Sequence, residues 1–309
     1  MGPLHPLIIG NHTLMWGEHT YVMGILNLTP DSFSGDGLLS SASLSHLPPF
    51  PTEMGGDTEG GALGQARRFL AAGAEILDIG GESTRPGSQP VEAEEEIRRV
   101  LPTIRTIVAE FPEALISIDT YKAAVAEEAL KAGAHIVNDV WGLRADANLA
   151  GVVTRHQATV VLMHNRSKPA NVEVRERLGK AYRGAEYQDL LEDVKRELLE
   201  SVAIAHSAGI PDEHIILDPG IGFGKTVEQN LELINHLDEI RALGFPVLFG
   251  PSRKAFIGYT LNLPVDQRLE GTAAAVAIGI ARGADIVRVH DVETMLRVAH
   301  MADAIVRRK

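Results

Sequence analysis

Arg288 and His290 lie two residues apart in the stretch IVRVHD, which runs from Ile286 to Asp291. Side chains two positions apart leave the same side of a β-strand, so one ligand can contact both of them. A guanidinium and an imidazole both donate hydrogen bonds. The pair therefore indicates a binding site, at the end of an apolar strand, for a ligand that carries hydrogen-bond acceptors.

Seven other apolar runs also end in polar or ionisable side chains. These residues are Asn27; Asp78, Glu82, Thr84 and Arg85; Asp119; Asn138 and Asp139; His164 and Asn165; Asp218; and Ser252, Arg253 and Lys254. Buried charges are costly unless they have partners. A single polar strand end is ordinary, whereas eight of them together indicate one shared site.

The eight apolar runs are rich in Ile and Val and are predicted to be strands. They span residues 21–29, 72–80, 115–120, 132–140, 159–164, 215–220, 246–252 and 282–290. Helix-like stretches span residues 97–108, 121–133, 186–207, 228–243, 268–282 and 293–307.

Strands that alternate with helices predict a parallel sheet, and eight such units predict an α/β fold of the (β/α)8 TIM barrel type. We expect a single domain over residues 1–309, with a doubly wound open sheet as the alternative fold. In a barrel, the polar strand ends meet at the C-terminal face, where barrel enzymes keep their sites. The segment 31–61 is rich in Gly, Ser and Pro and lacks periodicity. Because it follows the first strand, we expect a lid-like loop at that face.

Composition argues against several classes of function. The formal net charge is -12, which disfavours general binding of nucleic acids or anionic membranes. The chain has no cysteine, so thiolate nucleophiles, disulfides and iron–sulfur ligation are excluded. No apolar run reaches the ~18 residues of a membrane span, and the N-terminus shows no signal peptide. We therefore expect a cytoplasmic protein.

The stretch GIGFGKT, residues 220–226, looks like a phosphate-binding loop. The Walker pattern needs Gly where this chain has Pro219, and the dinucleotide pattern needs Gly where it has Lys225. No His residues show HExxH or comparable spacing. The sequence therefore favours neither nucleotide binding through this loop nor a zinc site.

Seven motifs, in order along the chain, together resemble the dihydropteroate synthase family. They are MGILNLTPDSFS (23–34), DIGGESTRPG (78–87), SIDTYK (117–122), NDVWG (138–142), LDPGIGFGK (217–225), GPSRKAFIG (250–258) and RVHDV (288–292). The resemblance implies a (β/α)8 barrel that joins 6-hydroxymethyl-7,8-dihydropterin pyrophosphate to 4-aminobenzoate in folate synthesis. The expected products are 7,8-dihydropteroate and pyrophosphate. It also implies Mg²⁺ as cofactor, a homodimer, and inhibition by sulfonamides.

The resemblance assigns pterin-binding roles to particular residues. Asp218 is expected to accept hydrogen bonds from two N–H groups of the pterin ring, while Asn138 and Asp119 bind the remaining ring nitrogens. Lys254 is expected to donate to the ring carbonyl, and Arg288 to stack on the ring face. The other candidates for substrate contact are Met163 and Phe223 as apolar walls, together with Ser252 and Thr84.

The resemblance also implies how the diphosphate is held. Asn27, directly or through Mg²⁺, is expected to bind it together with Arg85 and His290. These two cations, with Lys254 and Arg288, are the catalytic candidates, because stabilising the departing anion is the main work of a dissociative substitution.

Two other functions remain open at the level of sequence. A methyltetrahydrofolate-dependent methyltransferase barrel shares the pterin-reading residues but has no need for Arg85, Lys254 and His290 around a diphosphate. A pterin-binding paralogue without catalysis is favoured only by the first loop, which reads DSFSGDG where the family usually has DSFSDGG. This displacement leaves the role of Asp36 open.

Overall fold

Eight parallel strands form the centre of the protein. The computed structural model describes residues 4–29, 61–84, 87–168, 172–175, 177–182 and 184–307. Within these ranges the strands lie in the order β10-β7-β6-β5-β4-β3-β12-β11. Their bounds are β3 Tyr21–Asn27, β4 Ile76–Gly80, β5 Leu115–Asp119, β6 Ile136–Asp139, β7 Thr159–Met163, β10 Ile215–Asp218, β11 Leu248–Phe249 and β12 Ile286–Val289.

The two outermost strands of this order, β10 and β11, are also neighbours. A parallel bridge joins Leu217 of β10 to Val247, the residue before β11, and Leu217 N donates to Pro246 O at 2.9 Å. The sheet therefore closes into the predicted barrel, and the alternative of an open doubly wound sheet is wrong.

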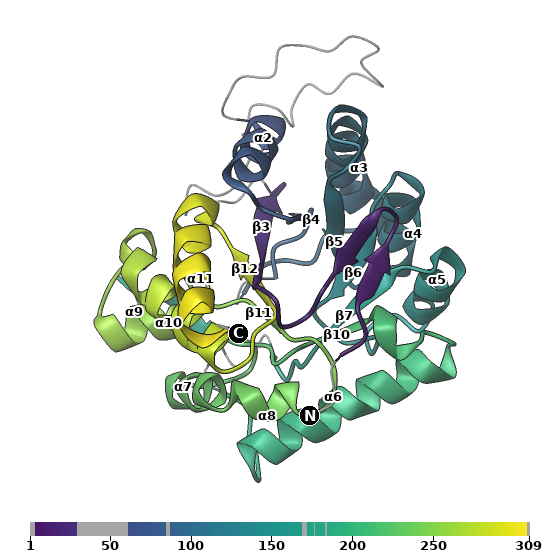
Figure 1. Cartoon of the computed structure of the whole chain (residues 1–309). Helices are drawn as coiled ribbons and strands as arrows, with labels where there is room; N and C mark the ends of the chain where they lie inside the picture. Colours follow the sequence, from purple (N-terminus) through teal and green to yellow (C-terminus); the bar gives the residue numbers. More distant parts are fainter. Residues whose placement is uncertain are drawn as a thin grey trace.

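Helices surround the strands (Figure 1). Their bounds are α2 Ala62–Ala72, α3 Ala93–Glu110, α4 Ala123–Lys131, α5 Leu149–His156, α6 Leu190–Ser207, α7 Val227–Asn235, α8 Leu237–Arg241, α9 Ala255–Leu261, α10 Leu269–Ala281 and α11 Val292–Val306. Buried side chains such as Ile104 of α3 and Val276 of α10 join the outward-facing strand residues in one large apolar cluster. This cluster fixes the outer wall of the barrel and thereby the position of each strand end.

The interior of the barrel is divided into an apolar and a polar half. The apolar half is a second cluster that contains Ile76, Leu115, Ile136, Val161, Ile216, Leu248 and Ile286. Two residues further along five of these strands, on the same side, stand Asp78, Ser117, Asn138, Asp218 and Arg288. The polar strand ends therefore face inwards because the period of two continues from the apolar half.

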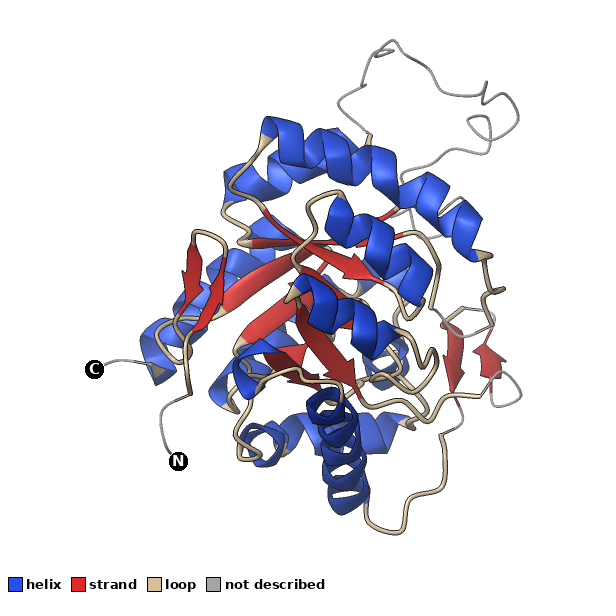
Figure 2. Cartoon of the chain, turned by 90° about the vertical axis from the view of Figure 1, so that its right-hand side faces the viewer, coloured by secondary structure: helices blue, strands red, loops and turns tan. Residues whose placement is uncertain are grey.

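A short antiparallel hairpin closes the apolar end of the barrel. It pairs β1, Leu7–Ile9, with β2, His12–Leu14, and its buried Leu7, Ile9 and Leu14 belong to the interior cluster. A second hairpin pairs β8, Val172–Arg175, with β9, Gly179–Tyr182. Figure 2 shows the two hairpins on opposite sides of the molecule.

The sequence predicted all eight barrel strands and most of the long helices. It missed α2, α5 and α9 and both hairpins. The hairpin strands have three or four residues each, which is too few for a clear periodicity. The single helix expected over residues 228–243 is divided at His236 into α7 and α8. Residues 31–60 of the expected lid lie outside the described residues.

The hairpin leads to a prediction about stability. Leu7 is fully buried, whereas the neighbouring Ile8 is 63% exposed. We expect Leu7→Ala to lower the free energy of unfolding by about 2–5 kcal/mol, because it removes apolar contacts and leaves a cavity. Urea unfolding followed by circular dichroism measures the change. Ile8→Ala is the matched control and should stay near wild type; equal losses in both variants would contradict a closing role for this hairpin.

Candidate active site

Arg288 of β12 crosses the polar half of the barrel to two carboxylates. Its Nε donates to Asp78 Oδ2 at 2.5 Å, and its Nη2 donates to Asp119 Oδ2 at 2.6 Å. Burial acts to lower the pKa of the guanidinium, but the two carboxylates outweigh burial and raise it. The side chain is therefore held as a cation, and carboxylates of β4 and β5, two and three strands away from β12, fix its plane.

Asn138 extends this network to β6. Its Nδ2 donates to Asp78 Oδ2 at 3.1 Å. Within the described part of the chain, Asp78 Oδ1, Asp119 Oδ1 and Ser117 Oγ are buried without a hydrogen-bond partner. Burial raises the pKa of Asp119 to about 7, against the lowering effect of Arg288 and with a further raising effect from Asp78. Unpartnered acceptor atoms therefore lie close to a buried cation.

Asp218 and Lys254 form the second charged pair of the site. Asp218 Oδ1 accepts from Gly220 N at 2.7 Å, and Lys254 Nζ donates to Ile221 O at 2.5 Å. Burial raises the pKa of Asp218, while the charge of Lys254 lowers it. Burial also lowers the pKa of Lys254 to about 8, against the opposing effect of Asp218. Each charge therefore offsets part of the other's cost of leaving water.

The wall beside this pair contains the predicted apolar residues. Lys254 Nζ lies 4.8 Å from the centre of the Phe223 ring. Met163, which is buried, stands opposite Asp218 in the pairing of β7 with β10. Gly250 lies on the other side, where an added Cβ would be 3.8 Å from both Arg288 Cβ and Lys254 Nζ. A flat ligand placed here meets an acceptor, two donors and an aromatic side chain.

His290 lies beyond Arg288, at the mouth of the barrel. Its Nδ1 is 3.0 Å from Ser252 Oγ, which also accepts from His290 N at 3.2 Å. The neighbouring Arg253 is instead bound to Asp291, with Nε donating to Oδ2 at 2.9 Å and Nη2 to Oδ1 at 2.5 Å. Asp291 is therefore neutralised by Arg253 rather than by Arg288.

Comparison with known proteins agrees with this geometry. The family model described as "Pterin binding enzyme" matches residues 53–290. The dihydropteroate synthase of Clostridium beijerinckii is 46% identical over 97% of this chain and 99% of its own, and that of Bacillus subtilis is 46% identical over 96% and 92%.

Solved structures show the same likeness. The dihydropteroate synthase of Clostridium difficile, determined in the presence of pteroic acid, has a TM-score of 0.80 and 45% identity over 95% of this chain and 99% of that chain. The dihydropteroate synthase of Xanthomonas albilineans with 4-aminobenzoic acid has a TM-score of 0.81 and 35% identity over 98% of each chain.

The chain belongs to the dihydropteroate synthase family. It is therefore a transferase of folate synthesis with the barrel fold of its relatives. The structure brings the predicted Asp119, Asn138, Asp218, Lys254 and Arg288 close together at the inner ends of the strands. For a member of this family, this group of residues is the candidate pterin site.

The remaining predicted residues lie at the rim or outside the described residues. Asn27 ends β3 next to Gly80 of β4, and its side chain is half-buried. Thr84 lies half-buried in the loop after β4. Arg85 lies outside the described residues, as does Asp36, whose role the sequence leaves open.

Several polar strand ends support the backbone instead of facing the cavity. Asp139 accepts from Trp141 N at 2.8 Å and from Leu143 N at 2.6 Å, which closes the turn after β6. Asn165 Nδ2 donates to Val140 O at 2.9 Å. Glu82 accepts from Val91 N at 2.9 Å and from Tyr121 Oη at 2.9 Å. These residues hold the loops between which the cavity opens.

Sequence reasoning left two important residues out of the site. Asp78, the carboxylate that joins Arg288 to Asn138, was noticed as a strand end but was not placed among the binding residues. Its signal was present, because Asp78 lies two positions after the interior Ile76. For Lys225, the sequence shows only that a lysine stands where the dinucleotide-binding pattern needs a glycine. The sequence offers no sign that it is buried.

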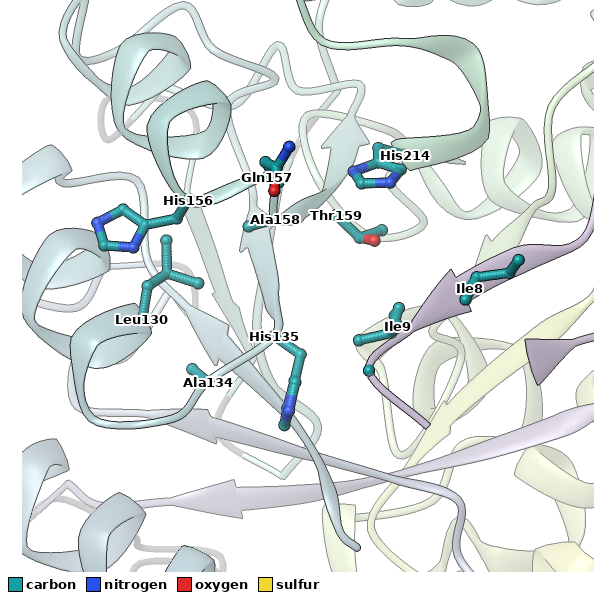
Figure 3. A pocket seen from close by; sticks show the side chains of 11 residues that line it. Ile8, Ile9, Leu130, Ala134, His135, His156, Gln157, Ala158, Thr159 and His214 are labelled. Carbon is teal, nitrogen blue, oxygen red and sulfur yellow. The ribbon is translucent and has the colours of Figure 1, made fainter. Parts of the chain in front are cut away.

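A separate cavity of about 430 Å³ lies near the closed end of the barrel. Figure 3 shows His135, His156 and His214 from three segments around it, with Ile8 and Ile9 of the hairpin on the other side. No cluster of three or more His, Asp or Glu residues in the described ranges could hold a metal ion. None of the converging charged residues lines this cavity, so it is distinct from the candidate pterin site.

None of the helices in the described ranges is long and apolar enough to cross a membrane.

The buried network predicts a large cost for losing one carboxylate. We expect Asp78→Asn to destabilise the protein by about 3–5 kcal/mol, because Arg288 stays buried with one countercharge fewer. Chemical unfolding monitored by fluorescence measures this change. Glu293→Ala, which breaks the exposed ion pair with Arg297, is the control and should leave the midpoint nearly unchanged. A midpoint for Asp78→Asn as high as that of the control would show that the network adds little stability.

Proposed function

We propose that this group of residues binds 6-hydroxymethyl-7,8-dihydropterin pyrophosphate and that the enzyme transfers its pterin-methyl group to 4-aminobenzoate, releasing pyrophosphate. The single observation that supports this assignment is the fixed arrangement of Arg288 between Asp78 and Asp119, beside the Asp218–Lys254 pair. It brings donors and unpartnered acceptors together, and a pterin ring carries groups that complement both.

The pterin ring would take its orientation from the charged pairs. Asp218 Oδ1 accepts a hydrogen bond from Gly220 N. The carboxylate would also accept from the two N–H groups at the amidine-like edge of the ring. Lys254 would donate to the ring carbonyl. Asn138 and Asp119 would meet the remaining ring nitrogens, while Arg288, whose plane is already fixed, would cover the ring face. Met163 and Phe223 would exclude water from the two sides.

The diphosphate would extend towards the mouth of the barrel. His290 and Ser252 form one side of this path, and Arg85 is proposed for the other. The carbon under attack carries a good leaving group, so donors aimed at the departing diphosphate lower the barrier by stabilising the charge that develops there. The aromatic amine then forms the new C–N bond and loses a proton, and no covalent intermediate with the enzyme is needed.

Mg²⁺ is proposed as a cofactor held jointly by the protein and the substrate. Magnesium commonly takes one or two protein oxygen ligands together with substrate phosphates. The half-buried Asn27 offers one such oxygen at a strand end, which fits a site shared with the substrate. When bound, the ion would neutralise part of the charge on the diphosphate.

The homodimer and the cytoplasmic location stay predictions. The outer faces of α10 and α11 expose Ile278, Met301 and Ile305, with exposed fractions of 49%, 63% and 67%. We propose this apolar face as the contact between two copies of the chain.

The proposed reaction is tested with labelled 4-aminobenzoate, the pterin pyrophosphate and Mg²⁺. Wild type should form labelled dihydropteroate. Asp218→Ala should weaken pterin binding by about 10²–10⁴-fold, because two charge-assisted hydrogen bonds of about 1.5–3 kcal/mol each are lost. His290→Ala should leave pterin affinity close to wild type and lower kcat by about 10²–10³-fold. Tight pterin binding without product in wild type would refute the transferase assignment of this chain and favour the non-catalytic alternative.

Pterin affinity should depend on the protonation of Lys254. Its pKa is lowered to about 8 by burial and by Arg288, against Asp218 and Asp119. The donor is present below that pH, so affinity should fall as the pH rises through about 8. Calorimetric titrations between pH 6.5 and 9.5 measure this fall. Lys254→Met should bind more weakly and lack this step, whereas an identical step in the variant would assign it to the ligand or to another group.

A further inference from the structure

Lys225, at the end of the GIGFGK stretch, is a buried cation with no direct role in the proposed reaction. Its Nζ lies 2.9 Å from Gly220 O, 3.1 Å from Phe223 O and 3.0 Å from His164 Nδ1. Only 2% of the residue is exposed. Burial lowers the pKa of Lys225 to about 7, and the nearby Asp218 opposes that effect. Two of the acceptors, Gly220 O and Phe223 O, belong to the loop after β10, and the third, His164, directly follows β7.

His164 lies between this amine and the carboxylate of Glu197. Burial lowers the pKa of His164 to about 4, so the ring is neutral near pH 7. Its Nδ1 faces Lys225, which is a donor, and its Nε2 lies 3.1 Å from Glu197 Oε2. Arg166 Nε donates to Glu197 Oε1 at 2.9 Å and holds the carboxylate in place. The imidazole therefore accepts from Lys225 with one nitrogen while the other faces Glu197.

The loop held by Lys225 carries three groups of the candidate pterin site. Gly220 N donates to Asp218, Ile221 O accepts from Lys254, and the Phe223 ring lies against the Lys254 ammonium. Gly220 has a φ of +70°, and an added Cβ would lie 1.8 Å from His164 O. The loop therefore packs closely against the end of β7, and hydrogen bonds from the Lys225 amine hold it in this position.

We propose that Lys225 is a positioning residue for the pterin site: by binding Gly220 O, Phe223 O and His164, it shapes the loop that aims Asp218 and Lys254 at the ring. This inference rests on the proposed function, since it assigns Lys225 to the same site. It also explains why a stretch similar to a phosphate-binding loop contains a lysine. The Lys225 amine binds backbone carbonyls of its own loop, so it is unavailable to a phosphate.

The test is Lys225→Met, which keeps an unbranched side chain and removes the three hydrogen bonds. We expect the dissociation constant for the pterin pyrophosphate, measured by calorimetry on the full-length protein, to rise at least tenfold. KM for 4-aminobenzoate at saturating pterin should stay within about threefold of wild type. A role confined to stability would lower the melting temperature without separating these two substrates. Wild-type pterin affinity in folded Lys225→Met, or an equal loss for both substrates, would overturn the inference.

Two further variants complete the experiment. Arg241→Met breaks another buried ion pair, in which Nε lies 2.7 Å from Asp285 Oδ2 at the start of β12, away from the site. It should lower the melting temperature but keep pterin affinity. If Lys225→Met does not fold, the test variant is His164→Leu, which removes one of the three acceptors of Lys225. We expect this variant to bind the pterin more weakly than wild type. Unchanged pterin affinity in His164→Leu would also overturn the inference. Because the readout is pterin binding, a wild type that binds pterin without forming product would refute the proposed reaction separately.

Discussion

The structure depends on keeping a guanidinium charged inside a barrel. Arg288 leaves β12 into a space with little access to water, and two carboxylates on β4 and β5 compensate for its lost hydration. An unpaired charge in that position would be strongly unfavourable. Asp78 and Asp119 must therefore face the same space as Arg288, which requires the strands to keep their register around the closed sheet. The second oxygen of each carboxylate, Asp78 Oδ1 and Asp119 Oδ1, is buried without a hydrogen-bond partner among the described residues.

The apolar half of the interior offsets the cost of burying the charged residues in the other half. On one side, the hairpin of β1 and β2 and the first inward residues of the strands form a closed apolar cluster. Their burial stabilises the barrel and separates the charged layer from solvent at the closed end. At the open end, Asp139, Glu82 and Asn165 satisfy backbone groups of the connecting loops, so those loops keep a defined shape. The charged residues between the two ends therefore have fixed positions and one accessible side.

Neighbouring residues in this layer have different tasks. Lys254 and Lys225 are both buried amines near Asp218, and burial lowers the pKa of each. Lys254 donates to Ile221 O and interacts with Asp218, whereas Lys225 donates to Gly220 O and Phe223 O and contacts His164. We assign ligand binding to Lys254 and positioning of the loop to Lys225. Preorganisation of this kind is useful to an enzyme because the binding groups need no rearrangement when the substrate enters.

The eight barrel strands, six helical segments, the barrel and the family could be predicted from the sequence, because apolar runs, helix-like stretches and seven motifs are local properties. Five of the proposed pterin-binding residues could also be named from those motifs, and they converge in the structure. The sequence alone could not separate polar strand ends that face the cavity from those that support loops. Asn138 and Asp139 are adjacent and equally polar, but side chains alternate along a strand, and only the closed barrel decides that Asn138 points inwards. The same holds for Asp78 and Lys225, since their partners are contributed by segments that come together only when the sheet closes and the loops fold over it.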